Sequence, residues 1–279
     1  MDTRVTGYYT AKTAQIMEKY GPGPRVHFHI GHFTPGAQPP TPSSLAELRA
    51  GLVAAQERLV AEAVAHWSGV AALGHRGLDV GCGLGGTSLW WAKELGCEVT
   101  AVTAVPEHAR LVEELAGSAG LTTVRCRVSD AHDTGDQARY DTAMAWEAAC
   151  YFDRPRWFAG LRRTLRPGGM VFVEDVFVRD PVPWKPVFDR YWRTDVASVD
   201  TYRRAAHTAG FTLVDERDLT AETSAFWDWS IAWNAERSRL PGADLPRLRA
   251  STAAHRRMRT AWNEGGIEVR LLAFERTGA

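Results

Sequence analysis

The sequence lacks the features that would place the protein on a nucleic acid or in a membrane. Its 33 basic and 33 acidic residues cancel to a formal net charge of +0 at pH 7, so no long-range field attracts polyanions or lipid surfaces. No run approaches the roughly 20 apolar residues of a membrane span, and the N-terminal stretch MDTRVTGYYTAKTAQ is unlike a signal peptide. We expect a cytoplasmic protein with no nucleic-acid or membrane partner.

Cysteine is also scarce. The four cysteines, Cys82, Cys97, Cys126 and Cys150, form no CxxC pair and lie in apolar or glycine-rich surroundings. This spacing favours reduced, buried thiols over disulfides or a metal site. Tryptophan, in contrast, is abundant, with 11 residues. Such a surplus of rings suits a pocket for a large, flat or cationic ligand as well as a core.

Residues 1–70 predict a helical cap. The pattern YYTAKTAQIMEKY indicates a helix over 8–20, which GPGP ends, and the proline-rich stretch 34–42 is a loop. Ser44 and Glu47 have the spacing of a capping box, and apolar residues follow at helical intervals to about Trp67.

From Arg76 the pattern alternates between strands and helices. We expect strands at 76–82, 97–103, 122–130, 140–147 and 169–178, with helices at 86–96, 106–119 and 154–166. This alternation predicts an α/β fold with a doubly wound parallel sheet. It loosens after residue 180, where we expect helical insertions at about 180–210 and 222–262, a strand near 211–219 and a final strand at 267–276. Residues 71–279 would thus form one α/β domain.

A glycine-rich turn provides the strongest local signal. In LDVGCGLGGTS, residues 78–88, Gly81, Gly83 and Gly86 satisfy GxGxxG, which also occurs in dinucleotide-binding proteins. However, Asp79 stands at the end of the preceding strand, where a carboxylate suits a ligand with an ammonium group better than a pyrophosphate. Thr103 occupies the place where NAD enzymes usually have an acid.

Together with VTAVT, SDAHD, YDTAMAWEA and LRPGG, this turn resembles the class I S-adenosylmethionine-dependent methyltransferases over about residues 70–178. The resemblance implies a Rossmann-like seven-stranded sheet whose last strand is antiparallel, and S-adenosylmethionine as cofactor. It places Asp79, Gly81 and Gly83 by the methionine moiety, Thr103 near the ribose, and Asp130 and Ala131 near the adenine, with Gly85 and Trp146 as further cofactor-binding candidates. Thr103 departs from the acidic residue that many members have there.

The stretch WEAACYF, which begins at Trp146, resembles methyltransferases that alkylate carbon, including the sterol side-chain enzymes. The N-terminal YY and KYGPGPRVHFHIGHF extend the resemblance to bacterial C-methyltransferases of prenyl diphosphates and indole alkaloids. An alkene or indole carbon becomes cationic when it accepts a methyl group, so Glu147 could stabilise that cation and take its proton. The alternative for Glu147 is a surface or capping carboxylate. Alternation along the next strand sends Glu174 and Asp175 to opposite faces, so at most one points at the site.

Other aromatic, histidine and arginine side chains complete the predicted site. Tyr9, His29 and Trp192 are further candidates for catalytic groups, and Tyr151, Arg179, Trp184 and His27 for substrate binding.

The substrate has two alternatives. A prenyl diphosphate needs converging cations, with Mg²⁺ as a further cofactor, and candidates are Arg25, Arg179, Lys185, Arg190, Arg193, Arg203 and Arg204. An indole methylated at carbon 3 needs none, and would use Glu147 to accept its ring NH. We favour the isoprenoid; a SAM-binding module without catalysis is a more distant alternative. Helical caps often mediate dimers, so by analogy a homodimer is expected.

His27, His29 and His32 fall within seven residues. In an extended chain His27 and His29 share one face, but no nearby cysteine or carboxylate completes a tetrahedral site, so we expect no metal. Histidines bonded to backbone are one alternative. We favour a pocket wall, with His29 or His27 facing the methyl donor or an anionic group of the substrate.

Overall fold

The computed structural model describes residues 3–179 and 184–278. Its central element is a seven-stranded sheet in the order β3-β2-β1-β4-β5-β7-β6. The strands are β1 (Arg76–Val80), β2 (Glu98–Thr103), β3 (Val124–Val128), β4 (Tyr140–Trp146), β5 (Leu165–Val178), β6 (Phe211–Asp218) and β7 (Ile267–Arg276). The first five strands are parallel, and β7 runs antiparallel to both β5 and β6. The predicted Rossmann-like sheet with an antiparallel last strand is confirmed.

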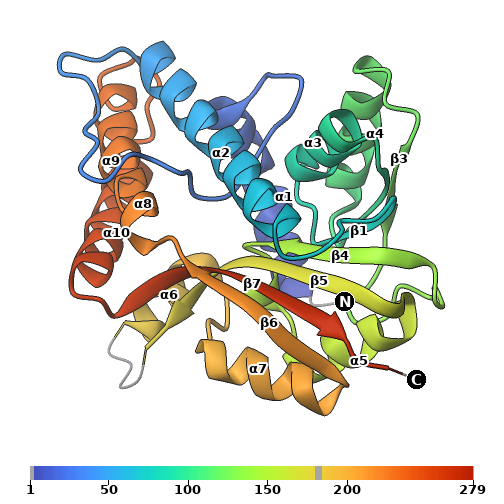
Figure 1. Ribbon diagram of the computed structural model, residues 1–279. Coiled ribbons are helices and arrows are strands. Elements are labelled where there is room, and N and C mark those ends of the chain that lie inside the picture. Colours follow the sequence, from blue (N-terminus) through green and yellow to red (C-terminus); the bar gives the residue numbers. More distant parts are fainter. Residues whose placement is uncertain (1–2, 180–183, 279) are drawn as a thin grey trace.

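Helices cover both faces of the sheet (Figure 1). One face packs against α2 (Leu45–Ser68), α3 (Gly86–Leu95) and α4 (Pro106–Ser118), and the other against α5 (Arg154–Thr164) and α7 (Val199–Thr208). Strand β5 shows why two cores form. Phe172 and Val176 face the first layer of helices, whereas Val173 and Phe177 face the second, because successive side chains of a strand point to opposite faces.

The N-terminal cap packs directly on the sheet. Helix α1 (Thr3–Tyr20) begins five residues before the predicted start, and α2 begins at the predicted capping box, in which Ser44 Oγ accepts from the Glu47 amide at 3.2 Å. Trp67, fully buried at the end of α2, stacks on Phe172 of β5 with ring centroids 4.8 Å apart. Cap and sheet therefore share one hydrophobic core.

The C-terminal helices extend this core at one end of the sheet. They are α6 (Lys185–Trp192), α8 (Thr220–Thr223), α9 (Phe226–Arg237) and α10 (Leu245–Asn263), and α9 and α10 lie beside α2 (Figure 1). Residues 180–183 of the predicted insertion lie outside the described residues. No helix in the described part of the chain is long and apolar enough to cross a bilayer.

Several predicted boundaries are wrong: α1 begins earlier than expected, and β5 begins at Leu165 instead of residue 169. The helix expected over 154–166 ends at Thr164, because Leu165 already pairs with Tyr140 and begins β5.

The strand order places a crevice at the carboxyl ends of β1 and β4. Strand β1 lies between β2 and β4, so the chain leaves β1 toward one side of the sheet and β4 toward the other. Ligands of open α/β sheets bind at such a switch point. The residues that follow these strands are therefore the first place to look for a site.

Candidate functional site

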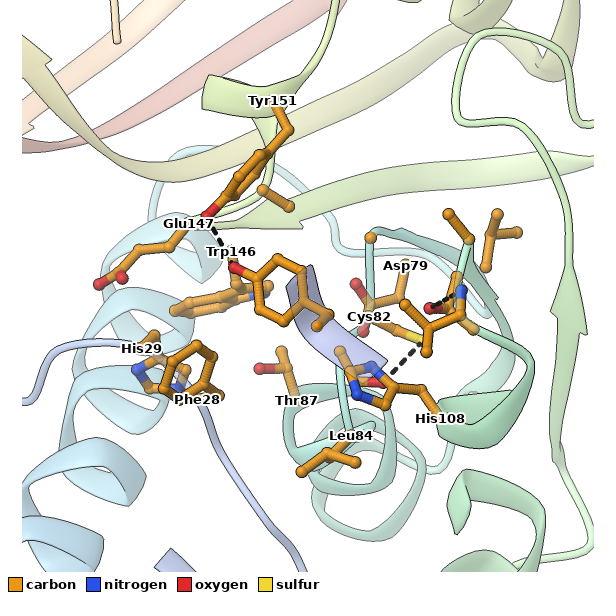
Figure 2. A pocket seen from close by; sticks show the side chains of 18 of the residues that line it. Phe28, His29, Asp79, Cys82, Leu84, Thr87, His108, Trp146, Glu147 and Tyr151 are labelled. Carbon is orange, nitrogen blue, oxygen red and sulfur yellow. Dashed lines mark hydrogen bonds between the residues drawn. The ribbon is translucent and has the colours of Figure 1, made fainter. Parts of the chain in front are cut away.

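A cavity lies at this switch point, where ligands of open α/β sheets bind. We call it the cofactor cavity. Asp79, Cys82, Thr87 and His108 lie along one side, and Phe28, His29, Trp146 and Glu147 along the other (Figure 2). The first group comes from β1, α3 and α4, and the second from the cap and β4. The cavity therefore separates the glycine turn from the predicted catalytic carboxylate.

The glycine turn allows close approach on two sides. Gly81 has φ +81°, and a Cβ there would lie 2.7 Å from Cβ of Ala148, so the turns after β1 and β4 touch. A Cβ on Gly86, the first residue of α3, would lie 2.6 Å from Nδ1 of His27. The cap segment thus rests on the start of α3. Gly83 also lines the cavity, whereas Gly85 faces Val112.

Asp79 is a buried carboxylate with one donor. It is 1% exposed, and its Oδ2 accepts from Ser88 Oγ at 2.5 Å. Burial raises the pKa of Asp79 to about 7, against the lowering effect of the Ser88 bond. A cationic group beside Asp79 would favour its ionised form.

The predicted ribose and adenine residues lie farther along the same edge. Thr103 lines the cavity, and its Oγ1 accepts from the Val105 amide at 3.1 Å, which leaves its own hydrogen free to donate. Ala131 lines the cavity too. Asp130 sits between lining residues, but its Oδ1 accepts from His132 Nδ1 at 2.7 Å and from the His132 amide at 2.9 Å. The structure thus places its carboxylate at the rim.

Glu147 follows β4 in an uncommon backbone conformation. Its φ is +42°, in the left-handed region that costs a non-glycine residue about 1–3 kcal/mol. The Glu147 amide still donates to the Glu174 carbonyl at 2.8 Å, and Oε1 accepts from the Ile30 amide at 2.6 Å. Burial, and secondarily the charge of Asp175, raise the pKa of Glu147 to about 8, against the lowering effect of the Ile30 bond. Only one of its oxygens is thereby occupied.

The neighbouring acids Glu174 and Asp175 are both 0% exposed and point to opposite faces, as alternation predicts. Asp175 accepts from the amides of Cys150 and Val176, each at 2.8 Å, and borders a second cavity. Neither oxygen of Glu174 has a partner among the described residues, and burial raises its pKa well above the ordinary value. The charge of Glu147 contributes to this rise, so the two carboxyl groups lie close to each other.

This second cavity, of about 500 Å³, adjoins the first and is walled by rings. We call it the aromatic cavity. It shares Tyr9, Phe28, His29, Glu147 and Tyr151 with the cofactor cavity and adds Tyr20, Phe188, Trp192, Phe226 and Trp227. The carboxylate of Glu147 therefore stands at the junction of the two.

Two tyrosines join the cap to this junction. Tyr151 Oη donates to the Trp192 carbonyl at 3.1 Å, so in the 2.7 Å bond between the two hydroxyls Tyr9 is the donor. Burial raises both pKa values well above the ordinary value. Tyr9 thus presents a neutral oxygen and a ring to the site.

The two histidines line the cofactor cavity and are bonded to each other. His29 Nδ1 lies 2.6 Å from the Ile30 carbonyl and must donate, while burial lowers the His29 pKa to about 3. Nε2 of neutral His29, 3.1 Å from His27 Nδ1, is therefore an acceptor. His27 Nε2 lies 2.9 Å from Glu57 Oε1. The roles of the two rings in catalysis and substrate binding stay predictions.

His32 lies apart from these two: its amide donates to the Ala55 carbonyl at 2.9 Å. No group of three metal-ligating side chains occurs within residues 3–179 and 184–278.

Comparisons with known proteins agree with this geometry. Residues 78–169 match a family model described as a methyltransferase domain. A 2-methyl-6-phytyl-1,4-hydroquinone methyltransferase of Synechocystis sp. is 30% identical over 74% of this chain and 62% of its own length. A geranyl diphosphate 2-C-methyltransferase of Streptomyces lasalocidi is 29% identical over 54% of this chain and 52% of its own. A solved geranyl diphosphate methyltransferase, in complex with GPP and sinefungin, has a TM-score of 0.81 at 22% identity, over 98% of each chain.

The chain has the class I S-adenosylmethionine-dependent methyltransferase fold. The chain spans 62% and 52% of the length of the two curated relatives.

Several cations predicted for a diphosphate form ion pairs and do not line the two cavities. Arg179 pairs with Glu268 at 2.9 Å, and Lys185 with Asp189 at 2.7 Å. Trp184 packs on Gly266 instead of facing substrate. Neither Arg179 nor Trp184 lines the cofactor cavity or the second, aromatic cavity, and their substrate-binding roles stay predictions. Arg25 and Arg203 also have carboxylate partners, while Arg190, Arg193 and Arg204 are exposed.

Residues that the sequence did not single out also line the site. Phe28 borders both cavities, and His108 lines the cofactor cavity, where its Nε2 bonds to Thr13 Oγ1 at 3.0 Å. Phe28 could have been found from its alternation with His27 and His29. Nothing in the local sequence of His108 indicates its position.

Proposed function

We propose that the protein is an S-adenosylmethionine-dependent C-methyltransferase. Its substrate would be the electron-rich sp² carbon of a small hydrophobic natural-product precursor, in the first place an isoprenoid diphosphate. The observation that carries the proposal is the position of Glu147: a largely enclosed carboxylate with one free oxygen, at the junction of the cofactor cavity and the aromatic cavity.

The cofactor cavity fits S-adenosylmethionine. Asp79, buried with a single hydrogen-bond donor, suits the amino group of the methionine moiety. The backbone after Gly81 allows close approach, and Thr103 has a free hydroxyl hydrogen for the ribose. When bound, this cofactor supplies an electrophilic methyl group.

The substrate provides the electrons. Its π bond forms the new carbon–carbon bond as the bond from methyl carbon to sulfur breaks, and a positive charge remains on the neighbouring substrate carbon. The free oxygen of ionised Glu147 stabilises this charge and takes the adjacent proton, which restores the double bond. The rings of Tyr9, Phe28 and Trp192 exclude water and offer π faces to the cation.

The decisive experiment is a mass-spectrometric screen with S-adenosylmethionine, with and without Mg²⁺. Prenyl diphosphates of increasing length are compared with indoles. We expect a gain of one methyl mass on a prenyl diphosphate. Methylation of an indole alone would transfer the proposal to carbon 3 of that ring, with Glu147 accepting the ring NH. Absence of S-adenosylhomocysteine binding in calorimetry would remove the proposal altogether.

Glu147→Gln tests the carboxylate itself. It keeps the size of the side chain and removes the base, so turnover should fall about 10²–10⁴-fold while S-adenosylhomocysteine binding stays the same. Glu107→Gln, on the exposed side of α4, is the matched control. Near-normal turnover of Glu147→Gln would exclude Glu147 from the reaction.

A further inference from the structure

A third cavity, of about 630 Å³, continues the aromatic cavity toward the surface. It lies among α1, α6, α9 and α10, and it shares Tyr20, Phe28, Trp192 and Phe226 with the aromatic cavity. Phe28 also lines the cofactor cavity. The three cavities therefore adjoin one another and share walls. We call the third one the basic cavity, for the residues described next.

Two lysines of α1 line the basic cavity without a carboxylate partner. Lys12 and Lys19 are seven residues apart and so lie on one face of the helix. Within the described residues, neither forms an ion pair with an acid. Lys12 Nζ is instead 4.7, 5.0 and 5.3 Å from the ring centroids of Tyr8, Tyr191 and Trp192.

Lys19 is in a similar position. Its Nζ donates to Ser230 Oγ at 3.0 Å and lies 5.6 Å from the ring centroid of Phe226. A hydroxyl and a ring satisfy an ammonium group only partly, because two N–H groups remain.

Further unpaired donors line the same cavity. Arg237 Nη1 and His255 Nδ1 are buried and have no hydrogen-bond partner among the described residues. His255 itself is only 5% exposed. Glu18, the one acid that lines the cavity, already accepts from Arg237 Nε, and Arg247 lies 3.6 Å from the exposed acid Asp244. The lining therefore has four cationic side chains, Lys12, Lys19, Arg237 and Arg247, and one described carboxylate, that of Glu18.

The electrostatics agree with a missing counter-charge. Burial, followed by the charges of Arg247 and Arg193, lowers the pKa of Lys12 to about 8. Burial, followed by the charge of Lys12, lowers the pKa of Lys19 to about 7. An anion placed between these two groups would favour the charged form of both.

We propose that the basic cavity binds the diphosphate group of the substrate, with the ammonium groups of Lys12 and Lys19 as its principal ligands. The inference rests on the proposed function. Seven residues of helix separate the two lysine Cα atoms by about 10 Å, so the cations flank a group longer than a carboxylate. The hydrocarbon chain would then run past Phe28 and Trp192 to Glu147.

The first experiment measures binding of inorganic pyrophosphate by calorimetry, with and without Mg²⁺. Lys12→Met and Lys19→Met keep side-chain length and apolar packing while removing the charge. We expect each to weaken pyrophosphate binding by at least about tenfold, because each removes a charge-assisted hydrogen bond. S-adenosylhomocysteine binding should be unchanged, which also shows that the variants fold. Lys93 is an exposed lysine of α3, and Lys93→Met is the control. It should leave the dissociation constants for pyrophosphate and for S-adenosylhomocysteine unchanged.

Unchanged pyrophosphate binding in both variants, or none by the unmodified protein, would overturn the inference. So would binding of indole-3-acetate that depends on Lys19 while pyrophosphate does not bind, since that outcome assigns the cavity to a carboxylate.

The second experiment separates this inference from the proposed function. For geranyl diphosphate, Lys12→Met and Lys19→Met should raise KM at least about tenfold, and for geraniol they should leave it unchanged. If geranyl diphosphate is methylated with a KM unaffected by either variant, the inference fails and the proposed function stands. If pyrophosphate binding needs both lysines but no isoprenoid is methylated, the anion site stands and the proposed function fails.

Discussion

The cofactor cavity and the basic cavity both share walls with the aromatic cavity, and the chain builds them differently. The cofactor cavity takes much of its wall from the ends of β1 and β2 and the turns that follow them, so short stretches of sequence carry its pattern. The basic cavity combines Lys12 of α1 with His255 of α10, residues that are distant in the sequence. When one supersecondary unit forms a site, its residues appear in the sequence as a motif. When distant helices form a site, the sequence shows only the ordinary amphipathic pattern of each helix.

This difference predicts that ligand binding in the cofactor cavity and in the basic cavity can be abolished separately. Gly81→Val should weaken S-adenosylhomocysteine binding by more than about 100-fold, because a β-branched side chain at φ +81° is strained and would meet Ala148. Pyrophosphate binding should stay within about twofold. Calorimetry with both ligands, after a thermal melt to verify folding, measures this. At Gly83 no heavy atom lies within 4 Å of an added Cβ. Gly83→Ala should therefore lose less affinity for S-adenosylhomocysteine than Gly81→Val does. Equal loss of both ligands in Gly81→Val would contradict the separation.

The pH dependence of the turnover number should reveal the ionisation of Glu147, which lies between the cofactor cavity and the aromatic cavity. Because burial raises the pKa of Glu147 to about 8, its ionised fraction falls tenfold per pH unit below that value. The turnover number at saturating substrate should therefore rise with pH and level off, with a midpoint between the ordinary value of the carboxyl and about 8. With a midpoint of about 6 or higher, the turnover number at pH 5 is at least about tenfold below its plateau. A profile already flat between pH 5 and 8 would show that no such carboxylate limits the reaction.

Trp192 lines both the aromatic and the basic cavity, so its loss should affect binding and turnover together. We expect Trp192→Ala to reduce kcat/KM for geranyl diphosphate about 10-fold, since a desolvated cation–π contact contributes roughly 0.5–2 kcal/mol. Trp192→Phe should recover most of this loss. Steady-state kinetics of the two variants measure the difference, and an inactive Trp192→Phe would argue for a role of the indole nitrogen.

The smallest effect is expected where the cap touches the cofactor cavity. Thr13→Val removes the 3.0 Å bond to the buried ring of His108, which should cost about 1–2 kcal/mol of the free energy of unfolding. Chemical denaturation measures this cost. S-adenosylhomocysteine should bind a few-fold more weakly and pyrophosphate equally well. Thr10→Val, on the exposed side of α1, is the control, and an equal effect there would mean that the bond to His108 contributes nothing.

The fold was predictable to the extent that its signals are local. Alternating strands and helices, the glycine turn and the capping box of Ser44 predicted the sheet and most helices. Helix α6 was not predicted as a separate element, because Pro186 near its start and the tryptophans around it obscure the helical pattern.

The site was predictable only in part, because charge and hydrogen bonding depend on distant partners. Position after a strand was enough to single out Glu147, but not its left-handed backbone. The hydrogen bonds of His27 and His29 could not be predicted, since Glu57, which bonds to His27, lies on α2. The ion pair of Arg179 with Glu268 also joins residues that are distant in the sequence. The sequence did not single out Lys12 and Lys19, because the other walls of the basic cavity come from α6, α9 and α10.

Phe28 lines all three cavities. Its position would let the protein select substrates by the length of their hydrocarbon chain. If the anionic end is held among the lysines, the carbon that reaches Glu147 depends on how much chain is needed to pass this ring. Selection would then act on the distance from head group to double bond. A change in the bulk of one aromatic side chain could therefore shift methylation to the next isoprene unit without altering any group that takes part in the chemistry.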